Sequence, residues 1–177
     1  CLILAGGFGT RLRSVVSDLP KSLAPVGDRP FLHWLLLNLK QQGLNEVTIS
    51  LHHRADLIKQ YLECEALDLK ISTVIEPNPL GTGGAVCYAI NQQQWNGHFF
   101  TINGDTWLGS WVSALGGVNS PKVGLVHVDD TSRYGRVDWR CQKVQHFLEK
   151  ENEMQHSGSV SARSTSACSS RCAKRSS

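Results

Sequence analysis

Apolar residues fall into two kinds of block along the chain, short continuous runs and longer segments with helical spacing. Short runs at residues 1–4, 46–51, 69–75, 98–102 and 122–128 predict β-strands. Longer segments at residues 31–42, 55–62 and 83–91 predict helices, and Gly43 is a typical stop for the first of them. Because strands and helices alternate, the pattern predicts an α/β fold of Rossmann-like, doubly wound type, with a mostly parallel sheet and helices on both faces.

The pattern changes towards the end of the chain. Two alternating segments within residues 136–149 flank Arg140 and Cys141, as expected of a hairpin. Residues 151–177 then contain nine serines and no aromatic residue, Leu or Ile, so they offer little apolar surface to offset the entropy of ordering. We expect a globular part at 1–150 and a disordered or frameshifted tail at 151–177, a natural low-complexity tail being the other explanation. Because Cys1 opens directly inside an apolar run, the chain is expected to be a fragment.

Composition excludes several classes of protein. The chain has 41% hydrophobic and 19% charged residues, which is ordinary for a globular protein. Its formal net charge is +3, of which four basic and two acidic residues of the tail supply +2, so the body has no basic excess for nucleic acid. No apolar run approaches the ~20 residues of a membrane span, and a cytoplasmic protein without membrane partners is predicted. The six scattered cysteines are interpreted as reduced thiols.

The first run leads into LAGGFGTRL, residues 4–12. Glycines let backbone N–H groups approach a ligand closely, and with Arg11 they suit a polyphosphate. A Walker loop is excluded because G-K-[ST] is absent, and a dinucleotide fingerprint would need glycine where Leu12 stands. Glycine spacing alone leaves an ordinary turn as an equal alternative. Ligands of such folds bind beyond the carboxyl ends of the strands, where strand order reverses.

The string GGFGTRL, followed by LPKSLAPV at residues 19–26, resembles the signature of the sugar-1-phosphate nucleotidyltransferases. The resemblance implies the nucleotide-diphospho-sugar transferase type of fold, incomplete here at its C-terminus, and a nucleotide-binding domain at 1–150. It also implies Mg²⁺ as cofactor, and a nucleoside triphosphate and a sugar 1-phosphate as substrates. The nucleotide-binding residues that it implies in this part of the chain are Leu4, Ala5, Gly6, Gly7, Gly9, Thr10, Arg11 and Lys21.

Two further motifs extend the resemblance on the nucleotide side. EPNPLGTGGA, residues 76–85, is a loop that enters a helix whose N-terminus could hold an anion. The resemblance implies base contacts from Leu80, Gly81 and Thr82, with Glu76 in a mainly structural role in the same pocket. In NGD, a lone aspartate is usually a turn or cap residue. The family pattern instead makes Asp105 a magnesium ligand, with Asn103 and Gly104 beside the nucleotide; the family's second metal-binding aspartate has no recognisable counterpart.

YGRV at 134–137 and FLEK at 147–150 are by themselves only a turn and a strand end. The resemblance, which covers residues 1–150, places the sugar and its phosphate against Tyr134, Gly135, Glu149 and Lys150. It also gives the catalytic set as Arg11, Lys21 and Asp105. Within the family the chain is most similar to the branch that makes GDP-linked heptose; the mannose 1-phosphate enzymes are the nearest competitors, and the base remains open between guanine and thymine or uracil.

Two hypotheses follow. The chain is an active nucleotidyltransferase, or it is a catalytically incomplete nucleotide-binding fragment, because part of the sugar pocket and the second aspartate are not found. Truncation would also leave apolar surface uncovered, which predicts marginal stability or association into homo-oligomers.

Overall fold

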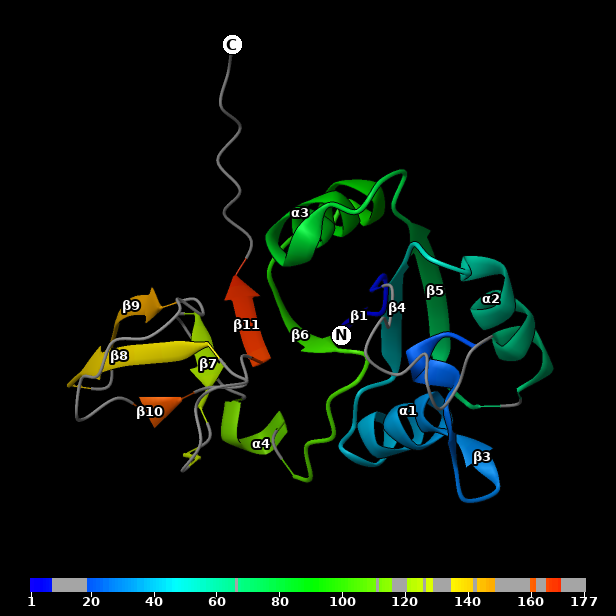
Figure 1. The fold of residues 1–177 in the computed structure, drawn as a ribbon, viewed down its shortest axis with the longest axis horizontal. Coiled ribbons are helices and arrows are strands. Elements are labelled where there is room, and N and C mark those ends of the chain that lie inside the picture. The colour runs from blue at the N-terminus through cyan, green and yellow to red at the C-terminus, as the bar shows by residue number, and fades with distance from the viewer. Residues whose placement is uncertain are drawn as a thin grey trace, which may run out of the picture.

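The structure is a computed structural model that describes residues 1–7, 19–65, 67–110, 112–115, 121–125, 127–128, 135–141, 143–148, 160–161 and 165–169. Its centre is a six-stranded sheet in the order β5-β4-β1-β6-β11-β7 (Figure 1). The strands are β1 Leu2–Leu4, β4 Glu46–Leu51, β5 Lys70–Ile75, β6 His98–Asn103, β7 Lys122–Gly124 and β11 Thr165–Ser169. The first four in spatial order are parallel, whereas β11 is antiparallel to both of its neighbours. The predicted α/β fold with a mostly parallel sheet is confirmed.

β1 lies at the point where the strand order reverses. Ile3 pairs with Ile49 of β4 on one side and with Ile102 of β6 on the other, and all three side chains are buried. Five consecutive residues of β4 are buried, as expected of a parallel strand that is covered on both faces. The chain therefore builds the sheet outwards from β1 in both directions, and the carboxyl ends of β1 and β6 flank the topological switch point.

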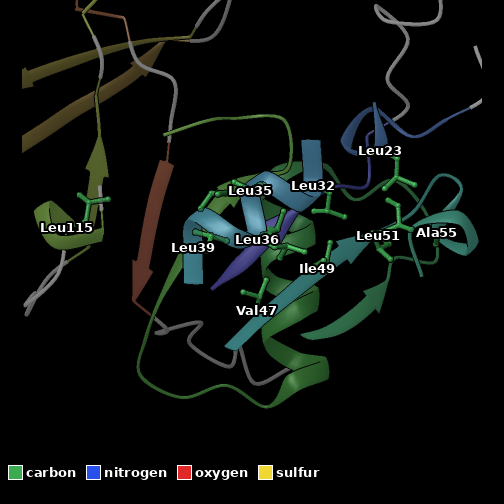
Figure 2. Packing of buried hydrophobic residues seen from close by; sticks show 13 residues of the cluster. Leu23, Leu32, Leu35, Leu36, Leu39, Val47, Ile49, Leu51, Ala55 and Leu115 are labelled. Carbon is green, nitrogen blue, oxygen red and sulfur yellow. The ribbon is translucent and has the colours of Figure 1, made fainter. Parts of the chain in front are cut away.

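The main helices are α1 Phe31–Gln41, α2 Ala55–Cys64 and α3 Gly81–Gln93, followed by the short α4 Val112–Leu115. Figure 2 shows α1 on one side of the sheet and α3 on the other, which confirms helices on both faces. The leucines of α1 form the main core with Val47 and Ile49; they are Leu32, Leu35, Leu36 and Leu39. Among the described helices, none is both long and apolar enough to cross a membrane.

Glycine ends α1 as predicted. Gly43 has a φ of +86°, which side chains with a Cβ rarely adopt, and the Leu44 N–H donates to the Leu39 carbonyl (3.1 Å). Other boundaries differ from the prediction. α3 begins two residues early, at Gly81, and β7 ends at Gly124 instead of residue 128, because its ladder with β11 ends at the pair Gly124–Thr165.

A second, three-stranded sheet has the order β10-β8-β9, with β8 Arg136–Arg140, β9 Lys143–Leu148 and β10 Val160–Ser161. β8 and β9 form the predicted hairpin, which turns at Cys141 with a φ of +50°. Figure 1 shows this small sheet beyond β7, on the side of the molecule away from β1. Cys1, Cys64, Cys87 and Cys141, the cysteines whose side chains are described, form no disulfide bond.

Seven residues of the segment 151–177 are described, and all of them are in β-strands. β10 pairs with β8, and β11 lies between β6 and β7. Such pairing uses backbone groups, so the serine-rich composition gives no sign of it. At these positions the chain is strand; for the remainder of 151–177, which lies outside the described residues, the disordered or frameshifted tail stays a prediction.

Candidate functional site

Loops from neighbouring parallel strands join at one edge of the large sheet. The Ala5 N–H after β1 donates to the Ser50 carbonyl of β4 (2.9 Å), and the Gly104 N–H after β6 donates to the Leu4 carbonyl (2.8 Å). Because the strands are parallel, these loops all follow carboxyl ends. They form a continuous ledge, which we define as residues 4–7, 50–52, 76–82 and 103–107.

Glu76 is the buried carboxylate of the ledge and is only 5% exposed. Its Oε1 accepts a hydrogen bond from the Ser50 hydroxyl (2.8 Å), and its Oε2 accepts one from the Leu80 N–H (3.3 Å). A Cβ added at Gly6 would stand 2.9 Å from Oε1. A side chain at position 6 would therefore press on the Glu76 carboxylate, which links Ser50 of β4 to the start of α3.

The signature lysine reaches the ledge from a separate segment. Lys21 begins a short 3-10 helix, η2 Lys21–Leu23, in which Ser22 and Leu23 are buried and anchor the turn. The Lys21 Nζ donates to Asp105 Oδ2 in an ion pair between residues 84 positions apart in the chain. The exposed fractions of the two side chains are 40% and 38%, so both charges remain open to a ligand.

Asp105 owes its place to the glycine before it. A Cβ at Gly104 would lie 3.0 Å from the Cβ of Ala5 and 3.2 Å from the Leu4 carbonyl oxygen, so only glycine lets the β6 loop meet the β1 loop without a shift. A turn follows, in which the Thr106 N–H donates to the Asn103 carbonyl (3.1 Å). This turn presents Asp105 beside the first glycine loop.

The N-terminus of α3 completes the described ledge. Since α3 follows β5, its first turn lies at the same edge of the sheet, and the N–H groups of a first helical turn lack helical partners. Leu80 is 38% exposed, and Gly81 and Thr82 are also exposed. The three residues with a predicted base contact are thus all accessible on the ledge.

Several predicted site residues are placed elsewhere or not described. Gly9, Thr10, Arg11, Tyr134, Glu149 and Lys150 lie outside the described residues. Gly7 is exposed on the ledge, with nothing within 4 Å of an added Cβ. Gly135 precedes β8 at the open end of the hairpin, where an added Cβ would be 3.6 Å from the Leu148 carbonyl oxygen. Its position is therefore on the small sheet and not on the ledge.

Two residues of this region, His52 and Trp107, are not among the site residues that the sequence predicts. His52 follows β4, and its Nδ1 lies 2.9 Å from the Glu76 carbonyl oxygen. Trp107 follows Asp105 by two residues, is half exposed, and makes an edge contact with Phe31 (ring centroids 6.5 Å apart). The available signal was position, because His52 and Trp107 both come within five residues after a predicted strand.

The ledge presents exposed residues of the first glycine loop and of the α3 N-terminus together with the partly exposed Asp105 carboxylate, and Lys21 adds a cation beside Asp105. This set suits a polyphosphate accompanied by a divalent cation. Within the described ranges no group of three or more His, Cys, Asp or Glu residues could hold a metal ion by itself. A cation held here would therefore take most of its ligands from phosphate and water.

A parallel sheet with a glycine loop after its first strand, and polar groups at the switch point, is the arrangement of nucleotide-binding α/β proteins. Residues 1–164 match the family model described as nucleotidyl transferase. The chain belongs to this nucleotidyl transferase family.

Relatives and solved structures agree with this assignment. The chain is 39% identical over 139 residues to D-glycero-alpha-D-manno-heptose 1-phosphate guanylyltransferase of Campylobacter jejuni, covering 77% of this chain and 62% of the relative. It is 32% identical over 162 residues to a probable mannose-1-phosphate guanylyltransferase of Oryza sativa, covering 84% and 44%. The crystal structure of HddC from Yersinia pseudotuberculosis complexed with GMP-PN superimposes with a TM-score of 0.75 at 34% identity, covering 95% and 75%. The chain thus spans less than two thirds of the length of both curated relatives.

Proposed function

We propose that the protein transfers a nucleotidyl group from GTP to a sugar 1-phosphate of the heptose or mannose type, giving a GDP-sugar and pyrophosphate. One observation carries the proposal: Lys21 and Asp105, which come from separate motifs, form an ion pair at the switch point between β1 and β6. Guanine and the type of sugar are proposed because the heptose and mannose relatives are both named guanylyltransferases.

On the nucleotide side, the amides of the first glycine loop hold the phosphates. Lys21, with Arg11, compensates the negative charge of the β- and γ-phosphates. Leu80, Gly81 and Thr82 contact the base at the exposed N-terminus of α3. The remaining members of the proposed nucleotide site are Leu4, Ala5, Gly6, Gly7, Gly9, Thr10, Glu76, Asn103 and Gly104. On the sugar side, Tyr134, Gly135 and Glu149 contact the sugar and Lys150 its phosphate.

The proposed reaction needs little proton chemistry. An anionic oxygen of the sugar 1-phosphate attacks the α-phosphorus, a new P–O bond forms, and the bond to the β-phosphate oxygen breaks as pyrophosphate leaves. The attacking oxygen is already ionised, so no protein base or nucleophile is required. Positioning of the two substrates and neutralisation of charge then carry the catalysis.

Asp105 fits a magnesium ion, because its partly exposed carboxylate is a hard oxygen ligand and already lies against a cation, Lys21 Nζ. When bound, Mg²⁺ would supply neutralisation of the α-phosphate charge. Asp105 would contribute one ligand, and Lys21 would turn from Asp105 to the phosphates.

The test is pyrophosphate release. The purified chain is incubated with Mg²⁺, one of GTP, ATP, UTP or dTTP, and heptose, mannose or glucose 1-phosphate. We expect release with GTP and a heptose or mannose substrate, and its loss on addition of EDTA. No release with any pair would overturn the proposed activity; if GTP still bound in equilibrium dialysis, the chain would be a nucleotide-binding fragment.

A further inference from the structure

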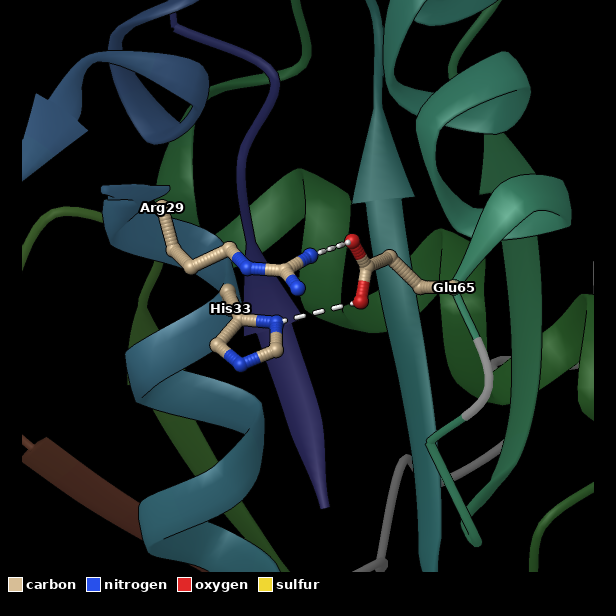
Figure 3. Close-up of polar contacts among 3 residues, drawn as sticks. All are labelled: Arg29, His33 and Glu65. Atoms are coloured by element: carbon tan, nitrogen blue, oxygen red, sulfur yellow. Dashed lines mark hydrogen bonds and ion pairs between the residues drawn. The ribbon is translucent and has the colours of Figure 1, made fainter.

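A cluster outside the ledge joins three elements through one carboxylate. Glu65 follows α2 and its side chain is only 14% exposed. Its Oε1 accepts a hydrogen bond from Arg29 Nη1 (2.9 Å), and its Oε2 lies 3.2 Å from His33 Nδ1 (Figure 3). Arg29 belongs to β3 Arg29–Pro30 and His33 to the first turn of α1. We call these three residues the Glu65 cluster.

The Glu65 carboxylate lies where few solvent molecules reach it. Burial, and then the negative charge of Glu65, raise the pKa of the neighbouring Tyr61 to about 12. A carboxylate held in such surroundings needs partners for its charge, and Arg29 and the mostly buried ring of His33 supply them.

The cluster is connected to Lys21 by a short path. β2 Pro25–Val26 pairs with β3, with Val26 opposite Arg29. The Phe31 N–H donates to the Ala24 carbonyl (2.9 Å), and the Ala24 N–H donates to the Lys21 carbonyl (3.1 Å). Two backbone hydrogen bonds therefore separate the start of α1 from the signature lysine.

A second contact stiffens the same path. The Trp34 Nε1 donates to the Val26 carbonyl (2.9 Å), so α1 also holds the β2–β3 hairpin directly. Any shift of the hairpin relative to α2 would move η2 and with it the origin of the Lys21 side chain.

The two other ion pairs outside the ledge that lie within the described ranges lack this combination. Lys70 and Glu46 pair at 3.0 Å but are 77% and 72% exposed. Lys40 and Asp68 also link α1 to the chain after α2, at the other end of α1, and Asp68 is 96% exposed. Exposed pairs of this kind contribute little. Glu65 is both shielded and shared between two elements that lead to Lys21.

We infer that Glu65, Arg29 and His33 are positioning residues for Lys21: the cluster fixes the β2–β3 hairpin against α2 and thereby sets where the Lys21 ammonium meets the phosphates. The inference rests on the proposed function for the role of Lys21. The fixing of the hairpin does not, and it is tested separately.

The first test measures the hairpin without any nucleotide. Amide hydrogen exchange is followed at Ala24 and Phe31 in the full chain and in Glu65→Gln. We expect exchange at both amides to become roughly tenfold faster, because the contacts of the Glu65 cluster no longer oppose local opening of the hairpin. Asp68→Asn is the matched control, since it breaks a link between the same elements far from η2 and should leave both rates unchanged. Unchanged rates in Glu65→Gln would overturn the inference.

The second test asks whether the effect passes through Lys21. Binding of GTP and GMP is compared in wild type, Glu65→Gln, Lys21→Met and the double variant. We expect Glu65→Gln to weaken GTP binding roughly three- to tenfold with GMP unaffected, and to have no further effect in the Lys21→Met background. Equal weakening of GTP and GMP, or additive losses, would show a merely structural role and contradict the inference.

Should Glu65→Gln fail to fold, Arg29→Ala serves instead, because Arg29 is half exposed and its truncation leaves no cavity in the core. The same outcomes are expected at Ala24, Phe31 and in GTP binding. If wild type binds no nucleotide, the proposed function fails, while the exchange rates still decide whether the cluster fixes the hairpin.

Discussion

The ledge and the β8–β9 hairpin carry the two halves of the proposed site, and they are built differently. The strands under the ledge are buried on both faces, with Ile3, Ile49 and Ile102 at most 1% exposed. In the hairpin, Trp139 is 47% and Phe147 63% exposed. The strands that carry the ledge lie in the interior of a layered fold, whereas the hairpin belongs to a small sheet with exposed aromatic side chains.

The difference explains which residues converge. In a parallel sheet every carboxyl end lies at one edge, so Gly6, Glu76 and Asp105 lie along the same edge although they follow three different strands. A hairpin brings together only its own two ends, here Gly135 and the Leu148 carbonyl. The topology of the parallel sheet therefore brings together residues of the proposed nucleotide half from distant parts of the chain. The hairpin brings together only neighbouring residues of the proposed sugar half.

The largest expected effect contrasts one carboxylate from each region. Asp105→Ala removes the proposed metal ligand and the partner of Lys21, so transfer should fall about 100- to 1000-fold. Asp138→Ala removes an exposed carboxylate of β8 and should leave the rate within about twofold. Steady-state pyrophosphate release measures both; full activity of Asp105→Ala would refute the metal assignment.

The next largest expected effect is a difference in stability between truncations in the main core and in the hairpin. Leu36 is fully buried in α1, and Leu36→Ala is expected to lower the free energy of unfolding by about 2–5 kcal/mol through lost transfer energy and a cavity. Leu148 of β9 is 45% exposed, so Leu148→Ala should cost well under about 1.5 kcal/mol. Urea unfolding of the two variants gives the comparison. Similar losses would mean that the end of the hairpin is covered in solution.

A glycine pair tests the close approach that builds the ledge. Gly104→Ala places a Cβ 3.0 Å from that of Ala5 and should destabilise the chain by about 1–3 kcal/mol. Gly109→Ala has nothing within 4 Å of the new Cβ and is the control, expected to be neutral or slightly stabilising. Thermal unfolding decides, and equal melting temperatures would contradict the steric argument.

The sequence predicted the parts of the fold that depend on local pattern. The buried run of β1, the stop of α1 at Gly43 and the hairpin around Cys141 all follow from periodicity and turn chemistry. The early end of β7 and the insertion of β11 between β6 and β7 did not, because both depend on a partner strand distant in the chain. Composition even argued against order in the β11 segment.

The candidate site shows the same limit. Resemblance of motifs singled out Lys21 and Asp105, and the strand-end rule placed both glycine loops at one edge. Their ion pair needed the structure, because the reach of Lys21 depends on η2 and the hairpin behind it. The Glu65 cluster had no sequence signal, since it arises where the end of α2 meets β3.

The smallest expected effect on stability comes from one of two residues that face each other in the hairpin. Val137 and Phe147 are direct partners in the β8–β9 ladder, yet Val137 is 2% and Phe147 63% exposed. Phe147→Ser should change the free energy of unfolding by about 0.5 kcal/mol or less, because little apolar area returns to water. Val137→Ala, on the same ladder step, should cost about 1–2 kcal/mol. Urea unfolding at low protein concentration measures both.

Protein concentration gives this pair its diagnostic value. If Phe147 is exposed in a monomeric chain, the effect of Phe147→Ser on the free energy of unfolding should be equally small at every protein concentration. If a second copy covers Phe147, Phe147→Ser will instead become costly as concentration rises, since association stabilises the folded chain by mass action. Sedimentation velocity of wild type and variant would then show an oligomer that Phe147→Ser weakens. In that case the hairpin would be covered in solution, and the contrast in exposure between the hairpin and the strands of the ledge would not hold.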